Sequence, residues 1–180
     1  MKTYSTIIIG LTVGLFYLLA IHEQRVFENN VKKATAIIVA KSNSQINGIV
    51  EFREYNGKVQ MKAVISSASQ GDHAIHIHVN GDCNSQDGTS AGGHWNPTNE
   101  PHGKWKTASF HRGDIGNIRV NENGKGSITR ETDLWCIGCE DEQKNILGKA
   151  IIIHQGPDDF SSQPAGAAGA RIGCGEIVQN

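Results

Sequence analysis

The chain has 180 residues, with 17 Lys and Arg against 18 Asp and Glu, and a net charge of -1. This length suits one domain with a short extension, and without a block of Lys and Arg a nucleic-acid partner has no electrostatic support. The 21 glycines and the aromatic content of only 6%, together with many short apolar runs, predict strands joined by tight turns.

The N-terminal segment is apolar and distinct from the rest of the chain. No charged residue lies between Lys2 and His22, and the run from Ile7 to Ile21 has the length of the hydrophobic region of a signal peptide. The uncharged stretch is barely long enough to span a bilayer. We predict a signal peptide at residues 1–21 and a polar linker at residues 22–33. The alternative is a membrane tether through residues 5–21. The remainder is then exported to an extracellular, periplasmic or lumenal space, or anchored with its domain outside.

From residue 34 onward the sequence is typical of an antiparallel sheet. Two strand-like segments flank Asn56-Gly57, a pair that favours a type I′ hairpin turn. A second hairpin is predicted at residues 114–133, turning at Asn123-Gly124. Single strands are predicted at four short apolar runs: residues 34–40, 74–79, 149–154 and 173–178.

Two segments without periodicity separate these strands, at residues 81–109 and 155–171. Loops of this length in a compact domain are usually functional or disordered. Several short strands, two long loops and no convincing helix predict an all-β sandwich or barrel.

Three of the eight histidines lie in the stretch HAIHIHVNGDC at residues 73–83. Strand side chains alternate between faces, so His76 and His78 share one face. The alternating apolar positions, ending in Val79, form the core face. Two imidazoles two residues apart on a strand can bind one metal ion. His73 has the opposite parity, and we predict a structural role for it.

Further histidines lie in three clusters along the chain. The loop segment AGGHWNPTNEPHGKW contains His94 and His102, the segment HRGD contains His111 and Asp114, and His154 ends a β-branched strand. Histidines with one carboxylate and no thiolate suit zinc and copper. The clusters therefore supply the further ligands that a metal site on the strand would need.

The four cysteines are Cys83, Cys136, Cys139 and Cys174. An even number in an exported chain indicates disulfides, and the count alone leaves three connectivities open. The segment WCIGC is similar to thioredoxin motifs, but no helix of an α/β fold follows it. A local disulfide, a solvent-exposed pair and a role in copper acquisition remain as interpretations of this pair.

Together these motifs resemble those of the copper/zinc superoxide dismutases. The resemblance runs from about Ala34 to Ile177 and is carried by the segments HAIHIHVNGDC, SAGGHWNP, HRGDIGN, IIIHQGPDD and GARIGCG. It implies a Greek-key β-sandwich or barrel of the immunoglobulin-like type at residues 34–180, with two long functional loops. It also implies conversion of two superoxide radicals and two protons to oxygen and hydrogen peroxide by redox cycling of a bound copper.

The resemblance assigns metal ligands. Copper would be bound by four imidazoles, from two strands and one loop: His76, His78, His94 and His154. A structural zinc would be bound by His94, which bridges the two metals, and by three further residues: His102, His111 and Asp114.

The resemblance also assigns residues around the metals. Asp158 would accept hydrogen bonds from one histidine of each metal, and Arg171 would guide and hold superoxide, acting in catalysis together with His94. Cys83 and Cys174 would form a disulfide. Members of the family dimerise through different faces, so a homodimer is implied without its face.

One departure from the family pattern concerns charge. The segment SSQPAGAAGA at residues 161–170 is uncharged, so electrostatic steering of the substrate would depend on Arg171 and on lysines such as Lys104, Lys106 or Lys149. The rival interpretations are a non-catalytic domain that binds copper and zinc, and a membrane-tethered structural protein. The complete set of copper histidines with Arg171 favours the enzyme.

Overall fold

The computed structural model describes residues 31–180, and the compact unit that contains seven of the eight histidines runs from Lys33 to Asn180. The predicted signal or tether segment and residues 22–30 of the predicted linker lie outside the described residues. Within residues 31–180, no helical segment has the length and hydropathy of a membrane span.

The described residues form nine strands and one short 3-10 helix. In chain order these are β1 (Lys32–Ala40), β2 (Asn47–Tyr55), β3 (Lys58–Ser66), β4 (Gly71–His78), η1 (Thr89–Ala91), β5 (Asp114–Val120), β6 (Gly126–Thr132), β7 (Ala150–His154), β8 (Arg171–Glu176) and β9 (Val178–Gln179).

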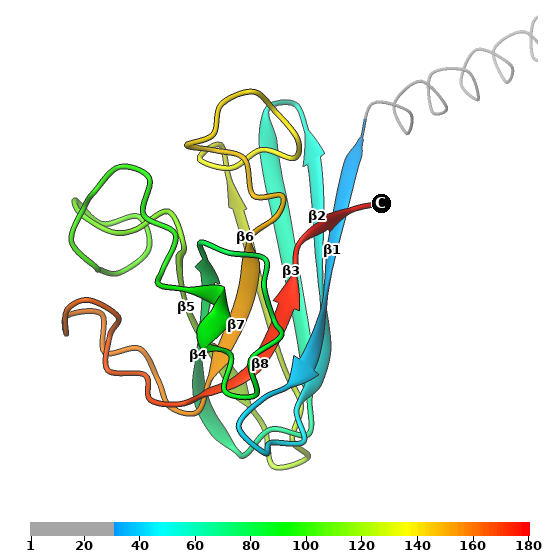
Figure 1. Cartoon of the computed structure of the whole chain (residues 1–180), viewed down its shortest axis with the longest axis vertical. Helices are drawn as coiled ribbons and strands as arrows, with labels where there is room; N and C mark the ends of the chain where they lie inside the picture. The colour runs from blue at the N-terminus through cyan, green and yellow to red at the C-terminus, as the bar shows by residue number, and fades with distance from the viewer. Residues whose placement is uncertain (1–30) are drawn as a thin grey trace, which may run out of the picture. The chain divides into compact units, whose positions relative to one another are not determined.

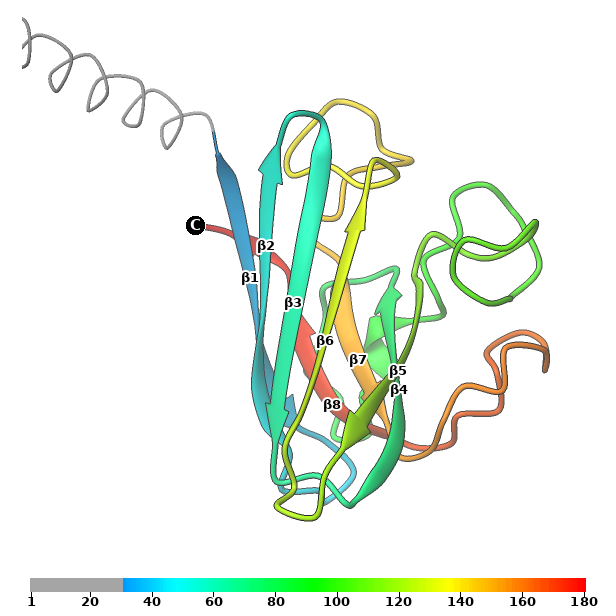
Figure 2. The same cartoon turned by 180° about the vertical axis from the view of Figure 1, so that it is seen from behind.

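The strands close into an antiparallel barrel. Their order is β2-β3-β6-β5-β4-β7-β8-β1-β9, and a further pairing of β1 with β2 joins the two ends of the sheet (Figures 1 and 2). The two-residue strand β9 pairs only with the start of β1. Closure leaves few free strand edges, and the predicted all-β barrel is confirmed.

The first predicted hairpin is confirmed in detail. Strands β2 and β3 pair without interruption from Asn47 opposite Ser66 to Tyr55 opposite Lys58. Asn56 and Gly57 both have positive φ, at 48° and 71°, as a type I′ turn requires. The second hairpin is wider, because β5 and β6 pair only at Val120 opposite Gly126.

Strand β4 is buried on both faces. Ile75 and Ile77 lie in the barrel core, and His76 and His78 are equally buried on the other face, beneath the long loops. The prediction that Val79 faces the core is wrong: the strand ends at His78, and Val79 is 45% exposed. The histidine face is therefore an interior surface rather than a solvated one.

Three long loops leave the barrel. The loops 79–113 (green) and 155–170 (orange) project from the same side in Figure 1, whereas the loop 133–149 (yellow to gold) lies at one end. Trp135, Ile137 and Ile146 of this third loop are buried in the main core cluster. The loop 133–149 therefore covers one end of the barrel with apolar side chains.

Candidate metal centre

Four imidazoles meet beside β4, and we name them the four-histidine group: His76, His78, His94 and His154. One ring nitrogen of each lies within 4.8 Å of those of the others. The strands β4 and β7 supply three of these residues, and adjacent pairing of β4 with β7 sets their spacing.

The fourth imidazole reaches the group because the loop runs back along the end of β4. The Trp95 N–H donates to the Ile77 carbonyl at 2.8 Å, and the Val79 N–H donates to the Gly93 carbonyl at 3.0 Å. These bonds place His94 directly opposite His78. The pairing of this loop with the end of β4 thus places His94 beside the other three imidazoles.

A second cluster shares His94, and we name it the mixed group: His94, His102, His111 and Asp114. Their ligand atoms also lie within 4.8 Å of one another. The Asp114 carboxylate lies 2.8 to 3.2 Å from one ring nitrogen of each of the three histidines. It also accepts the backbone N–H groups of His111 at 2.7 Å and of Gly103 at 3.1 Å. One carboxylate at the start of β5 therefore gathers three separate loop positions.

Six buried ring nitrogens in these two groups lack a well-aligned hydrogen bond: His76 Nδ1, His78 Nε2, His94 Nε2, His102 Nδ1, His111 Nδ1 and His154 Nε2. Two of them, His102 Nδ1 and His111 Nδ1, lie 3.0 and 3.2 Å from the Asp114 carboxylate. A buried polar atom without a partner costs roughly 1–3 kcal/mol, so the other four in one region need a shared compensating partner. Neutral imidazoles with one carboxylate are donors that copper and zinc accept. The residues present therefore fit both metals.

The opposite ring nitrogens are held in place, which aims the unpaired ones at the two metal positions. His78 Nδ1 donates to the Gly92 carbonyl at 2.9 Å, and His154 Nδ1 donates to the Gly169 carbonyl at 3.2 Å. Such bonds fix the tautomer and the ring orientation of a metal-binding histidine.

Asp158 links the two groups from behind. Its two carboxylate oxygens accept hydrogen bonds from His76 Nε2 and His102 Nε2, each at 2.9 Å. The carboxylate packs so closely on the backbone of Gly166 that a Cβ there would collide with it and with His102. One buried carboxylate therefore orients a member of each group.

The electrostatics of the two groups differ. Burial lowers the pKa of His154 to about 3 and that of His94 to about 4, and the neighbouring His76 imidazole adds to both effects. Burial also holds the pKa of His78 well below its ordinary value. Three imidazoles of the four-histidine group are thus neutral at pH 7, which is the form that binds a metal.

In the mixed group, charge pairing outweighs burial. Burial opposes protonation of His102, but pairing with the Asp114 and Asp158 carboxylates raises its pKa to about 9. Burial likewise opposes ionisation of Asp114, but the surrounding imidazoles hold its pKa far below the ordinary range. Without a metal, this group therefore holds a proton near neutral pH.

Arg171 is the cation nearest to the four-histidine group. It begins β8 opposite His154, and its Nη1 donates to the Gly88 carbonyl at 2.8 Å. With His78, His94 and His154 it lines a hollow of about 340 Å³, and no other Lys or Arg in the described part of the chain lines it.

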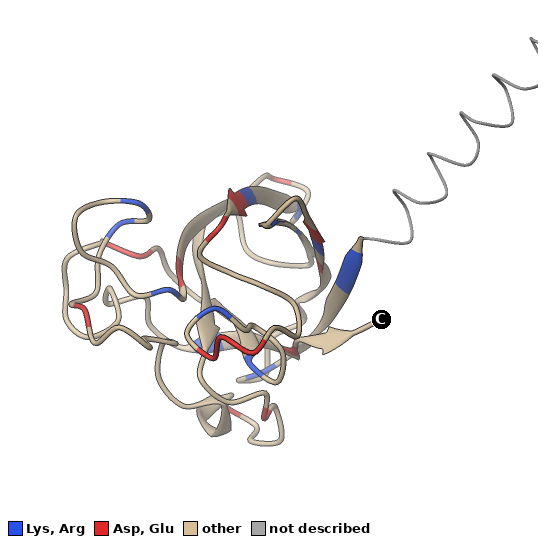
Figure 3. Ribbon diagram, turned by 90° about the horizontal axis from the view of Figure 1, so that it is seen from above, with Lys and Arg blue, Asp and Glu red and all other residues tan. Residues whose placement is uncertain are grey.

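The lysines proposed for steering do not line this hollow. Lys104 lies over the Phe160 ring, Lys106 donates to the Glu131 carbonyl, and Lys149 lies over the Trp95 ring. Figure 3 shows basic and acidic positions scattered along the ribbon rather than gathered by sign. Among residues 31–180, Arg171 is therefore the one Lys or Arg that lines this hollow.

Comparison with known proteins decides the family. Residues 46–177 match the family model described as copper/zinc superoxide dismutase (SODC). The chain belongs to the copper/zinc superoxide dismutase family. It is 36% identical to superoxide dismutase [Cu-Zn] 5 of Dictyostelium discoideum, over 80% of this chain and 97% of the relative. It is 35% identical to superoxide dismutase [Cu-Zn] 3 of Arabidopsis thaliana, over 81% and 89%.

A solved structure agrees with this assignment. The crystal structure of the clock protein EA4 matches with a TM-score of 0.71 and 30% identity, covering 81% of this chain and 92% of that chain. The chain is thus a superoxide dismutase whose cofactors are copper and zinc, which converts two superoxide radicals and two protons to oxygen and hydrogen peroxide.

All four cysteines of this dismutase are paired. Cys83 is bonded to Cys174 on β8, three residues beyond Arg171, and Cys136 is bonded to Cys139. The local disulfide is the first of the three interpretations left open for the WCIGC segment. His73 is buried, with its Nδ1 2.9 Å from the His154 carbonyl, which agrees with a structural role.

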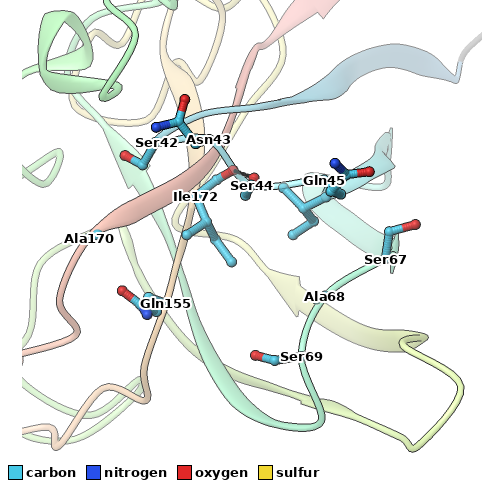
Figure 4. A pocket seen from close by; sticks show the side chains of 11 residues that line it. Ser42, Asn43, Ser44, Gln45, Ser67, Ala68, Ser69, Gln155, Ala170 and Ile172 are labelled. Atoms are coloured by element: carbon cyan, nitrogen blue, oxygen red, sulfur yellow. Dashed lines mark hydrogen bonds between the residues drawn. The ribbon is translucent and has the colours of Figure 1, made fainter.

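Sequence reasoning missed two serines that hold the arginine strand. Ser42 Oγ donates to the Arg171 carbonyl at 2.9 Å, and Ser44 Oγ donates to the Ile172 carbonyl at 2.6 Å. Both line a second hollow, of about 330 Å³, in which most of the lining side chains are uncharged and polar (Figure 4). Their signal is weak, because Lys-Ser-Asn-Ser is an ordinary turn sequence.

Proposed function

We propose that the four-histidine group holds the copper of this dismutase and that the mixed group holds its zinc. The observation that carries this division is the set of six buried ring nitrogens without a well-aligned hydrogen bond, gathered in two groups that share His94. The mixed group offers four protein ligands, which is the closed arrangement of a structural zinc. Three members of the four-histidine group line the hollow beside Arg171, as a site that must admit substrate requires, whereas the mixed group reaches it through His94 and His111.

Copper, when bound, supplies the alternating one-electron oxidation and reduction that dismutation needs. The chain supplies the attraction and placement of the anion. The Arg171 guanidinium, held at the Gly88 carbonyl, can bind superoxide by a charge-assisted hydrogen bond. Because both metal groups sit on paired strands and braced loops, the ligand geometry is set before the metals arrive.

Proton delivery is assigned to His94. The reaction consumes two protons, and His94 Nε2 is a buried nitrogen that faces the copper group and has no other partner. This atom would hold a proton only while it does not coordinate copper, and it would then release that proton beside the hollow. The His94 Nδ1 atom lies on the side of the mixed group, 2.8 Å from the Asp114 carboxylate, so the mixed group, with its zinc, would fix the ring during this exchange.

The test compares the full-length protein with His154→Ala, by metal analysis and by a superoxide dismutation assay. We expect one copper and one zinc per wild-type chain, and a variant that keeps zinc but loses copper and activity. Full activity in His154→Ala would overturn the copper assignment. A wild type that binds both metals without activity would indicate a non-catalytic binding domain.

We also propose that residues 1–21 direct export as a signal peptide or a tether, that residues 22–33 are a linker, and that residues 34–180 are the catalytic domain. Two disulfides with no free cysteine among the described residues are typical of an oxidising compartment. Mass analysis of the protein recovered from expressing cells tests this. Loss of about the first twenty residues supports a cleaved signal, and an intact chain in the membrane fraction supports the tether.

Finally, we propose a homodimer. Exposed β-branched side chains lie along the neighbouring strands β1, β2 and β3: Ile37, Val39, Ile49 and Val64. Ile49 lies directly opposite Val64 in the sheet, so these positions adjoin, and adjoining exposed apolar residues mark interaction surfaces. Light scattering of the wild type and Ile37→Lys tests this. A dimer that the variant converts to a monomer supports the proposal, and a monomeric wild type contradicts it.

A further inference from the structure

The loop 133–149 contains a disulfide that dismutation itself does not use. Cys136 and Cys139 are bonded across two intervening residues. Cys136 is also fixed through its backbone, since its N–H donates to the Lys144 carbonyl at 2.8 Å and its carbonyl accepts the Ile146 N–H at 3.1 Å. Directly before it stands Trp135, which is only 1% exposed.

Trp135 contacts both chain segments that carry the mixed group. Its Nε1 donates to the carbonyl of Arg112 at 2.9 Å, and Arg112 follows His111. Its ring lies 5.0 Å, centroid to centroid, from that of Trp105, three residues after His102. In return, Arg112 Nη1 donates to the Leu134 carbonyl at 3.0 Å. A reciprocal pair of hydrogen bonds thus joins the loop 133–149 to the turn between His111 and Asp114, two members of the mixed group.

That turn lies just before β5, and its other hydrogen-bonded anchors lie on either side of Arg112. His111 and Asp114 are joined by two hydrogen bonds within the turn, at 2.7 and 3.0 Å, and the Gly113 N–H donates to the Trp95 carbonyl at 2.9 Å. Arg112 lies between these anchors, and its carbonyl receives the indole N–H. A shift of residue 112 would therefore move the His111 ring relative to the Asp114 carboxylate.

Trp135 is itself held from two directions. Its ring meets the edge of Phe52, with the ring centroids 6.4 Å apart, and the Ile137 N–H donates to Glu54 Oε2 at 2.7 Å. Phe52 and Glu54 both lie on β2. The disulfide closes the segment that starts next to Trp135, which limits the positions open to the indole.

We propose that Trp135, restrained by the Cys136–Cys139 disulfide, is a positioning residue for the zinc ligands His102 and His111. The inference rests on the zinc assignment proposed above. It gives the WCIGC segment a role at the zinc site without making either cysteine a metal ligand.

The test uses full-length protein, stripped of metal and loaded with zinc alone, with affinity measured by competition against a chromogenic chelator. Trp135→Phe keeps an aromatic ring but removes the N–H donor, so we expect zinc binding to weaken roughly 3- to 10-fold, the value of one hydrogen bond. C136A/C139A should weaken it by a smaller factor. Phe52→Leu is the matched control, because it removes aromatic packing on Trp135 but keeps the hydrogen bond from the indole N–H to the Arg112 carbonyl.

A second readout is the visible spectrum of cobalt(II) bound in place of zinc, which reports ligand geometry directly. We expect Trp135→Phe to alter the spectrum clearly more than Phe52→Leu, which keeps the indole N–H bond to the Arg112 carbonyl. Equal zinc affinity in Trp135→Phe and wild type, or an equal loss in Phe52→Leu, would overturn the proposal. If only C136A/C139A kept the wild-type zinc affinity, the disulfide would have no part in positioning Trp135. A wild type that binds no zinc would instead refute the zinc assignment.

Discussion

The two disulfides close loops of very different length, which gives a quantitative prediction. Cys83 and Cys174 are 91 residues apart, whereas Cys136 and Cys139 are 3 apart. In the chain-entropy relation, the stabilisation grows with the logarithm of loop length and is about 4.6 kcal/mol for the first bond and about 1.6 kcal/mol for the second. Removing the first bond should therefore cost about 3 kcal/mol more free energy of unfolding than removing the second.

The experiment compares C83A/C174A with C136A/C139A in thermal unfolding of the metal-free proteins, so that metal binding does not add to the measured stability. Each variant replaces two cysteines with alanine, and each pair includes one buried sulfur, at Cys174 and at Cys136. The packing loss is thus matched. We expect the midpoint of thermal unfolding to fall by roughly 9–18 °C in the first variant and by roughly 3–6 °C in the second. Equal losses would refute the loop-entropy reasoning.

Three further predictions concern the site. Arg171→Ala should lower kcat/KM roughly 10- to 150-fold, because one charge-assisted hydrogen bond is lost, and should leave the copper content unchanged. The control is Arg119→Ala, which removes an exposed arginine paired with Asp72 and should keep full activity. Arg171 is the one Lys or Arg of the described residues at the hollow. Raising the ionic strength from 10 to 150 mM should therefore slow the reaction by no more than about threefold. A steep fall in the rates measured by stopped flow would contradict this. Because the pKa of His102 is raised to about 9, zinc loading at pH 7.5 should release about one proton, measurable by calorimetry in buffers of different ionisation enthalpy. The same raised pKa stabilises the metal-free protein fully below pH 6.5, and that contribution should disappear as the pH rises through about 9.

The fold could be predicted where local sequence determines it. Asn56-Gly57 specifies a turn whose two positive φ angles few other pairs tolerate, and the β2–β3 register follows from it. The end of β4 could not be predicted in this way. Val79 continues the apolar alternation, but the Val79 N–H bonds to the Gly93 carbonyl of a loop rather than to a strand. Strand ends depend on the partner, which a local pattern does not identify.

The sequence predicted which histidines lie together in the candidate site, but not how deeply they are buried or where the lysines lie. Strand parity placed His76 and His78 on one face, and the structure brings these two together with His94 and His154. Parity did not indicate that this face is buried, because burial depends on where the loops 79–113 and 155–170 fold. For the same reason the lysines could not be located. Lys149, for example, lies over the Trp95 ring and not at the hollow.

The contacts of the loop 133–149 could not be predicted from the local sequence pattern. A buried tryptophan usually needs an acceptor for its N–H, so the sequence around Trp135 predicts a hydrogen bond but not its partner. The acceptor is the Arg112 carbonyl, 23 residues earlier in the chain, and it is available because both segments lie at the same end of the barrel. The two cysteines beside Trp135 invite a search for metal or redox chemistry within the motif itself. Their consequence for the metal centre instead passes through the neighbouring indole, which is why the spacing of the motif could not reveal it.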